Sequence, residues 1–309
     1  MNTPNPARRS EIYDLGYRNY DGPRLGRAYA VRSLTTLSLR NTFGLGRKPM
    51  SKVIAWVLVA AALVPAVIQV AIGALIPLDD GEVFEFWTPE GYYVSIQTIL
   101  VLFVAAMASE LVGNDRKNNT LPLYFSRPIE RSDYVLAKVG ALTLGLQMLT
   151  LLPQLVLFFG TWAGSTDSSA WISDNIENLP AIIVSALLVS AEFAAIAIVV
   201  ATFATKRAFA LVSILGALLL SMMATAIIAQ LVPEKVASAV MLVCPIYVTR
   251  AVTLVLFDAM PHVERLSRAE GVGDQIAAVG LPGAVWIAAC LAHIALAVWF
   301  SIRRYRDTI

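Results

Sequence analysis

Glu192 has the clearest capacity for chemistry in this sequence, because it lies in the middle of a long apolar run. Residues 180–205 contain no other Asp, Glu, Lys or Arg. An ionisable side chain at the centre of a bilayer is costly, and it commonly marks a proton or ion site. The same carboxyl group could instead be protonated or hydrogen-bonded and hold two helices together. The sequence leaves both interpretations open.

Other polar residues are spread through the apolar runs. Inside a membrane, glutamines more often join helices by hydrogen bonds than bind a ligand. His293 stands alone in the last apolar run, and we expect it to be a satisfied bundle residue rather than a ligand. The glutamines are Gln69, Gln97, Gln147, Gln154 and Gln230.

The sequence contains no pattern typical of an enzyme active site. Histidine and acidic residues do not recur at metal-binding spacing, and no Gly-x-Ser-x-Gly turn is present. The phosphate-binding pattern GxxxxGK[ST] is also absent, and the nearest basic glycine segment, FGLGRKPMSK, lacks its spacing. We therefore predict no catalytic residue, no metal site and no cofactor bound by this chain.

The composition indicates that these residues belong to a membrane protein. The chain has 309 residues, of which 57% are hydrophobic and 15% charged, whereas soluble domains carry about a quarter charged residues. The apolar residues occur in long runs, as in proteins that cross a membrane several times. Cys244 and Cys290 lie in apolar surroundings, so we expect buried thiols rather than a disulfide. Residues 1–25 are polar, without the apolar region of a cleaved signal peptide, and predict a cytosolic segment.

Six of the apolar runs are long enough to cross a bilayer as helices. Residues 236–257 are also apolar, but Pro245 and Arg250 interrupt them, and Arg is costly inside a membrane. We predict that they form a broken, re-entrant-like helix pair that does not cross. The sequence thus predicts an all-α membrane protein with a transmembrane domain over 53–305 and spans at 53–76, 93–109, 134–160, 180–205, 208–232 and 281–302.

The basic residues are distributed unevenly about these spans. Most of the 24 Lys and Arg residues precede the first span or follow the second, fourth and last, and none follows the first or third. The positive-inside rule therefore predicts that both termini are cytoplasmic in the plasma membrane. Residues 26–48 predict an amphipathic helix at the interface, with Leu34 and Leu37 opposite Arg32 and Arg40. A cytosolic helix packed on protein is the alternative.

A polar segment over 109–139, SELVGNDRKNNTLPLYFSRPIERSDYVLAKV, separates the second and third spans. Thr120 is expected to cap a short helix over 121–126, with Pro122 in its first turn. Ser132 is expected to cap the third span. The residues that predict a turn after the second span are Gly113, Asn114, Asp115, Asn118 and Asn119.

The short helix predicts a docking surface. Its apolar side chains would be exposed and ringed by Arg and Lys, which is how protein interfaces combine apolar anchors with a charged rim. An ordinary loop packed on its own bundle is compatible with the same residues. The apolar side chains are Leu121, Leu123, Tyr124 and Phe125.

The segment over 109–139 resembles the signature region of ABC-2 type transporter permeases. The shared features are an acid that closes the second span, a basic pair, a Thr-Leu pair, a Ser-x-Pro-like element, an Arg-Ser start to the third span and a Lys within it. Here these are Glu110, Arg116, Lys117, Thr120, Leu121, Ser126, Pro128, Arg131, Ser132 and Lys138.

This resemblance implies a permease that pairs with a second permease subunit and with a separate ATP-binding subunit, which binds ATP and Mg. It implies that the ATP-binding subunit contacts the segment through Glu110, Thr120, Leu121, Leu123, Tyr124, Phe125, Arg127 and Arg131. It also favours Gln97 and Gln230 as residues of the translocation path, because the second and fifth spans line the dimer interface in this family. An exporter is the expected function.

Two other functions are compatible with the sequence. An ion- or proton-coupled carrier would use Glu192 and need no ATPase, although no convincing internal repeat supports it. A membrane anchor or assembly scaffold would need no polar residues in its spans, so the polar groups in several spans argue against it. No feature of the chain predicts a nucleic-acid partner.

Overall fold

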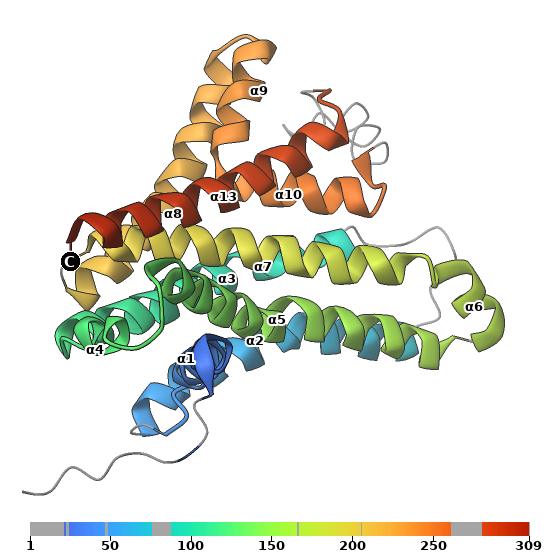
Figure 1. Cartoon of the computed structure of the whole chain (residues 1–309). Helices are drawn as coiled ribbons and strands as arrows, with labels where there is room; N and C mark the ends of the chain where they lie inside the picture. Colours follow the sequence, from blue (N-terminus) through green and yellow to red (C-terminus); the bar gives the residue numbers. More distant parts are fainter. Residues whose placement is uncertain are drawn as a thin grey trace, which may run out of the picture.

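The computed structural model of the protein is built from α-helices (Figure 1). The structure describes residues 22, 25–46, 49–75, 88–165, 167–204, 206–260 and 280–308. Within these ranges every regular element is a helix, which confirms the predicted all-α class. Six helices are long and apolar enough to cross a membrane, as predicted: α2 (Pro49–Leu75), α3 (Pro89–Lys117), α5 (Arg131–Gly164), α7 (Asn178–Phe203), α8 (Arg207–Leu231) and α13 (Gly283–Thr308).

The helices α5 and α7 lie side by side at the centre of the molecule (Figure 1). Helix α3 contacts both, α2 packs against α3 and α5, and α13 packs against α7. Leu146 and Phe193 are fully buried where these helices meet. The small residues Ala194 and Ala197 of α7 are also buried, and small side chains allow neighbouring backbones in a membrane to approach closely.

The outer faces of the bundle are apolar. Only 17% of the most apolar stretch of helix α8 is buried inside the protein. Val212, Leu220 and Leu231 on this helix are exposed. Apolar faces of this extent are unfavourable in water but favourable in contact with lipid. The six helices and their exposed faces therefore indicate an integral membrane protein.

Helix α3 is longer than the predicted second span. The turn expected at Gly113, Asn114 and Asp115 is wrong, because these residues continue the helix to Lys117. The chain turns only at Asn118 and Asn119, where Asn119 adopts the left-handed φ of 49°. Packing overrides the local turn preference here, since Leu111, Val112 and Asp115 are buried. Gly113 lies against Arg207, whose Cβ would stand 3.3 Å from a Cβ added at Gly113.

Helix α1 (Gly26–Thr42) packs against α5. Its buried residues are Leu34, Ser38 and Thr42, whereas Leu37 is 45% exposed. The buried face therefore includes Leu34 of the predicted apolar face but not Leu37. Ser38 and Thr42 complete it, and Gly145 of α5 leaves room for Thr42, because a Cβ there would lie 2.9 Å from Cγ2 of Thr42.

The predicted broken pair consists of α9 (Glu234–Val243) and α10 (Pro245–Leu256). The two helices are bent by 101° at Cys244, because Pro245 cannot continue the hydrogen-bond ladder of α9 and instead begins α10. At 1.5 Å per residue they are about 15 and 18 Å long. Each is shorter than the roughly 30 Å apolar core of a bilayer.

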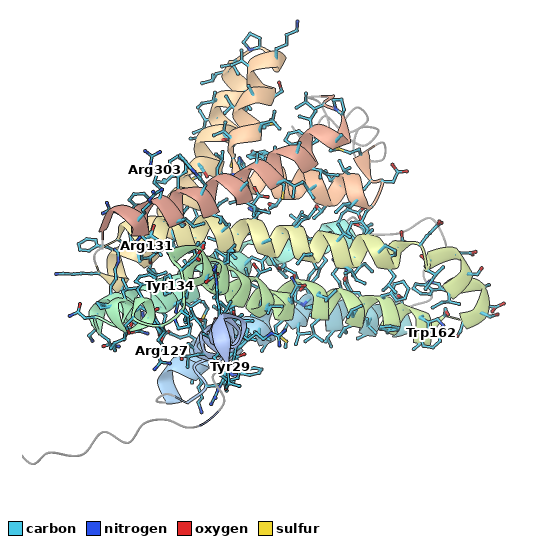
Figure 2. The ribbon with its side chains drawn as sticks, viewed as in Figure 1. Tyr29, Arg127, Arg131, Tyr134, Trp162 and Arg303 are labelled. Atoms are coloured by element: carbon cyan, nitrogen blue, oxygen red, sulfur yellow. The ribbon has the colours of Figure 1, made fainter. Side chains whose placement is uncertain are left out.

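The two ends of the bundle differ in charge. Helix α4 (Leu121–Phe125) and the C-terminal end of α13 lie at one end, and α6 (Ser168–Asn175) lies at the other (Figure 1). We call these the α4 end and the α6 end. Figure 2 shows Arg127, Arg131 and Arg303 at the α4 end and Trp162 at the α6 end. The charged residues about α6 are Asp167, Asp174 and Glu177.

Candidate functional site

Helix α4 is a single turn that follows the turn at Asn118 and Asn119 after the end of α3. Thr120 precedes it, but its side chain does not cap the helix as predicted, because its backbone is already helical. The Thr120 hydroxyl and amide both donate to the backbone carbonyl of Asp115, at 3.2 and 3.0 Å. Thr120 therefore fastens α4 to the last turn of α3.

Only one of the apolar side chains of α4 is fully exposed. Leu123 is 66% exposed, whereas Leu121, Tyr124 and Phe125 are half-buried. The rings of Tyr124 and Phe125 pack on Tyr134 of α5, with centroids 5.9 and 6.0 Å from its ring. The expectation that all four side chains face outward is therefore wrong; Leu123 is exposed, and so is Arg127, which follows α4.

A buried polar network holds Tyr134 in place. Its hydroxyl donates to Oδ2 of Asp115 at 2.8 Å, and Nζ of Lys138 lies 2.7 Å from the same oxygen. The Lys138 ammonium also donates to the carbonyl of Leu111 at 3.3 Å, and its side chain is 2% exposed. The ring of Tyr305, on α13, packs against Tyr134 at 5.2 Å. Tyr134 and its partners, on which α4 packs, thus join α3, α5 and α13.

Part of this network could be anticipated from the sequence. Lys138 belongs to the resemblance, but Asp115 was expected in a turn, and Tyr134 was not singled out. Tyr134 and Lys138 lie one turn apart on α5, so they share a face. That spacing could have suggested a shared acidic partner on the preceding span.

Two further contacts connect α3 to its neighbours at the α4 end. Glu110 is nearly buried, and its Oε2 lies 3.3 Å from the guanidinium of Arg207 at the start of α8. Arg116 donates to the carbonyls of Ala204, at 2.6 Å, and Thr202. Cationic groups are favourable at the C-terminal carbonyls of a helix, so Arg116 stabilises the end of α7. Glu110 therefore joins two helices, and α4 rather than Glu110 forms the exposed surface.

The first turns of α1 and α5 are joined by an ion pair. Nε and one terminal nitrogen of Arg27 donate to Asp133 at 2.8 and 2.9 Å, and the other donates to Glu130 at 2.5 Å. The hydrogen bonds to Asp133 and Glu130 raise the pKa of Arg27 above its usual range. Glu130, with Asp133, forms the capping box of α5, so the prediction that Ser132 caps this helix is wrong.

A groove opens between α4, the start of α5 and the end of α13. Its volume is about 440 Å³, which is within the range of ligand pockets, about 300–1,000 Å³. At the edge of this groove, the guanidinium carbon of Arg131 lies over the ring of Phe125, 5.9 Å from the ring centroid. We call it the α4–α13 groove, and it is lined by Phe125, Ile129, Glu130, Arg131, Ser132, Ile302 and Arg306.

Glu192 has a partner that the sequence did not suggest. Nδ1 of His293, on α13, lies 2.6 Å from Oε1 of Glu192, so His293 is a satisfied residue of the bundle, as expected, and its partner lies on another helix. Glu192 is 0% exposed, and its Oε2 has no hydrogen-bond partner in the part of the chain that the structure describes. The thiol of Cys290 lies beside the same carboxyl group and interacts with it. The pair connects α7 to α13 in the interior of the spans.

Gln97 lies elsewhere in the bundle. Its Nε2 is 3.2 Å from the sulfur of Met222 on α8, and it lines a small cavity of about 20 Å³ with Tyr93 and Arg250. A cavity of this size holds about one water molecule. Gln230 is exposed on α8. The structure thus does not bring Gln97, Glu192 and Gln230 together in one cavity.

No model of a known protein family matches the chain, and no curated protein matches it. The resemblance to ABC-2 type permeases therefore depends on the residues of the segment over 109–139.

Proposed function

We propose that this chain is the membrane-spanning permease subunit of a transporter driven by ATP. Within that class, the segment over 109–139 supports an ABC-2 type permease that acts as an exporter. The observation that carries the proposal is α4, a short helix between two spans that presents Leu123 outward and is supported by a buried ion pair.

In this function a separate ATP-binding subunit binds ATP and Mg and contacts α4 at the basic end of the bundle. That end faces the cytoplasm, both termini are cytoplasmic, and the plasma membrane is the location. Closure of the ATP-binding subunits displaces α4. Because Tyr134 connects α4 to α3, α5 and α13, the displacement reaches three spans at once. A second permease subunit completes the translocation path.

The substitution Leu123→Asp tests this proposal. Leu123 is exposed and outside the spans, so the variant should fold, but a carboxylate replaces the apolar anchor of the contact. We expect about a tenfold or greater loss of ATP-binding subunit from the purified complex, and loss of coupled ATP hydrolysis. Ile176→Asp is the matched control, because Ile176 is 49% exposed at the α6 end. Full coupling in Leu123→Asp would overturn the role of α4.

A second function is favoured by the Glu192–His293 pair. In a proton-coupled carrier, Glu192 would bind and release the proton, with His293 as the adjacent acceptor. The variant Glu192→Gln keeps the shape of the side chain and removes the titration. A carrier predicts uptake driven by a pH gradient in liposomes that contain this chain alone, and its loss in Glu192→Gln. If the chain is instead an ATP-driven permease, we expect no such uptake with the wild type or with Glu192→Gln.

A further inference from the structure

A surface rich in basic and aromatic side chains lies where three of the membrane-spanning helices begin or end. Helix α7 ends at Phe203 and α8 begins at Arg207. The guanidinium carbon of Arg304, near the end of α13, lies over the ring of Phe203 at 5.4 Å from its centroid, so α13 ends beside them. We call this surface the α7–α13 edge, and it consists of Phe203, Lys206, Phe209, Trp299, Arg303 and Arg304.

The aromatic rings of the α7–α13 edge face outward. Phe203, Phe209 and Trp299 are 56%, 59% and 48% exposed. Aromatic rings at the ends of spans are typical of the level at which the apolar core of a bilayer meets the lipid headgroups. The guanidinium carbon of Arg303 lies over the Trp299 ring at 5.3 Å from its centroid, and Figure 2 shows Arg303 at this end of α13. Arg303 and Arg304 thus place positive charge directly beside apolar surface.

The charge of the α7–α13 edge is strongly positive. Residues 203–210 contain two Lys or Arg residues and residues 299–306 contain three, which makes five in all, and neither range contains Asp or Glu. Glu110 lies nearby on α3, but Arg207 already engages it at 3.3 Å. Helix α8 begins after Lys206 without a side-chain cap, and the amides of an uncapped first turn also favour an anion. The edge is therefore suited to a negatively charged ligand.

The edge is continuous with the lipid-facing surface of the spans, and this continuity identifies the ligand. Phe209 is followed along α8 by the exposed Val212, and Trp299 is preceded along α13 by the exposed Leu296. A lipid whose acyl chains cover these side chains carries its headgroup to the level of the basic residues. Clusters of basic residues between helices at a membrane surface bind anionic headgroups in this way.

We propose that the α7–α13 edge binds an anionic phospholipid of the leaflet at the α4 end. The headgroup phosphate accepts from the basic side chains, and the acyl chains lie along Trp299 and Phe209. A zwitterionic phospholipid also carries a cationic group, which the positive charge of the edge disfavours, so the site selects lipids with net negative charge. The bound lipid connects the ends of α7, α8 and α13. This inference does not depend on which of the two functions proposed above is correct.

Native mass spectrometry of the purified full-length chain tests the selectivity of the edge, with phosphatidylglycerol and phosphatidylcholine added in parallel titrations. We expect phosphatidylglycerol to bind about tenfold more tightly. Lys206→Gln and Arg303→Gln should each weaken its binding about fivefold, since one basic residue near a membrane surface contributes about this much, and should leave phosphatidylcholine binding unchanged. Lys235→Gln is the matched control, because Lys235 is an exposed Lys on α9 rather than at this edge.

Equal binding of the two lipids by the wild type would overturn the proposal, and so would unchanged phosphatidylglycerol binding in both edge variants. Inorganic phosphate in excess should leave phosphatidylglycerol bound, because free phosphate has no acyl chains to contact Trp299 and Phe209. Displacement of the lipid by inorganic phosphate would assign the site to a free anion and contradict the proposal.

Photocrosslinking in native membranes identifies the occupant directly. With Phe209→p-benzoylphenylalanine, we expect an adduct whose added mass is that of an anionic phospholipid. Lys206→Gln in the same chain should reduce this adduct. An adduct with a second copy of this chain or with another protein would show that protein covers the edge, and adducts with phospholipids in proportion to their abundance would show no selectivity. Either result would overturn the proposal.

Discussion

At the scale of single residues, the α4 end depends on charges that are buried only because they are paired. Lys138 and Asp115 lie 2.7 Å apart with side chains that are 2% and 11% exposed. A buried pair need not stabilise a fold more than apolar residues would, but removal of one partner leaves an uncompensated buried charge. The pair also fixes Tyr134, on which the rings of α4 pack.

We predict that Lys138→Met destabilises the protein by about 3–5 kcal/mol, because Asp115 loses its counter-ion while buried. The double variant Lys138→Met with Asp115→Asn should recover a large part of this loss, since Asn can still accept from Tyr134. Thermal unfolding of the purified protein in detergent measures both. This interpretation would be contradicted if the double variant lost as much stability as the two single variants lose together, or more.

Residue contacts were also the hardest features to predict from the sequence. Glu192 and His293 each stood out, but they are separated by 101 positions, and their contact depends on how α7 and α13 are rotated about their axes. Hydropathy is the same for any rotation of an apolar helix, so it does not contain this information. Asp115 was misplaced for a related reason, because a local preference for turns was overridden by its buried partners.

At the scale of elements, the helices approach closely where glycine leaves space. Thr42 of α1 is wedged against Gly145 of α5. The Thr42 hydroxyl donates to the carbonyl of Ser38 at 3.1 Å, which fixes its rotamer and holds Cγ2 toward α5. The contact, rather than a strong apolar face, positions α1 across the bundle.

We predict that Gly145→Ala destabilises the packing of α1 by about 1–3 kcal/mol, the usual cost of overpacking. Gly140→Ala on the same helix should be neutral or stabilising, because a Cβ there meets no atom within 4 Å. Hydrogen–deuterium exchange over residues 26–42 reports the packing. Adding Thr42→Ala to Gly145→Ala should restore protection, and persistent rapid exchange in that double variant would argue against the steric explanation.

At this scale the sequence predicted the number of membrane-spanning helices well, but it predicted their caps and the buried face of α1 less well. The six spans and the break at Pro245 follow from apolar run length and from proline, and both are local properties. The cap of α4 was predicted wrongly because the backbone of Thr120 is already helical. The cap of α5 was predicted wrongly because Glu130 and Asp133 form a reciprocal capping box there, although Ser132 is also a residue type that caps helices. The face of α1 was predicted only in part, because the small polar residues Ser38 and Thr42 are buried beside Leu34, whereas Leu37 is exposed.

At the scale of the whole molecule, the two ends of the bundle differ. The α4 end combines basic residues, the exposed Leu123 and the α4–α13 groove, whereas the residues about α6 are acidic. Such an arrangement suits a chain that receives force from a partner at one end and passes it to its spans. The central claim is that this partner is a separate ATP-binding subunit.

Native mass spectrometry of the complex purified from its own membranes under mild conditions tests this claim most directly. We expect an assembly that contains this chain, a second permease subunit and ATP-binding subunits. We further expect that Leu123→Asp releases the ATP-binding subunits while the permease subunits stay folded. If the intact wild-type chain is found without any ATP-binding subunit under conditions that keep its permease partner bound, the account is contradicted.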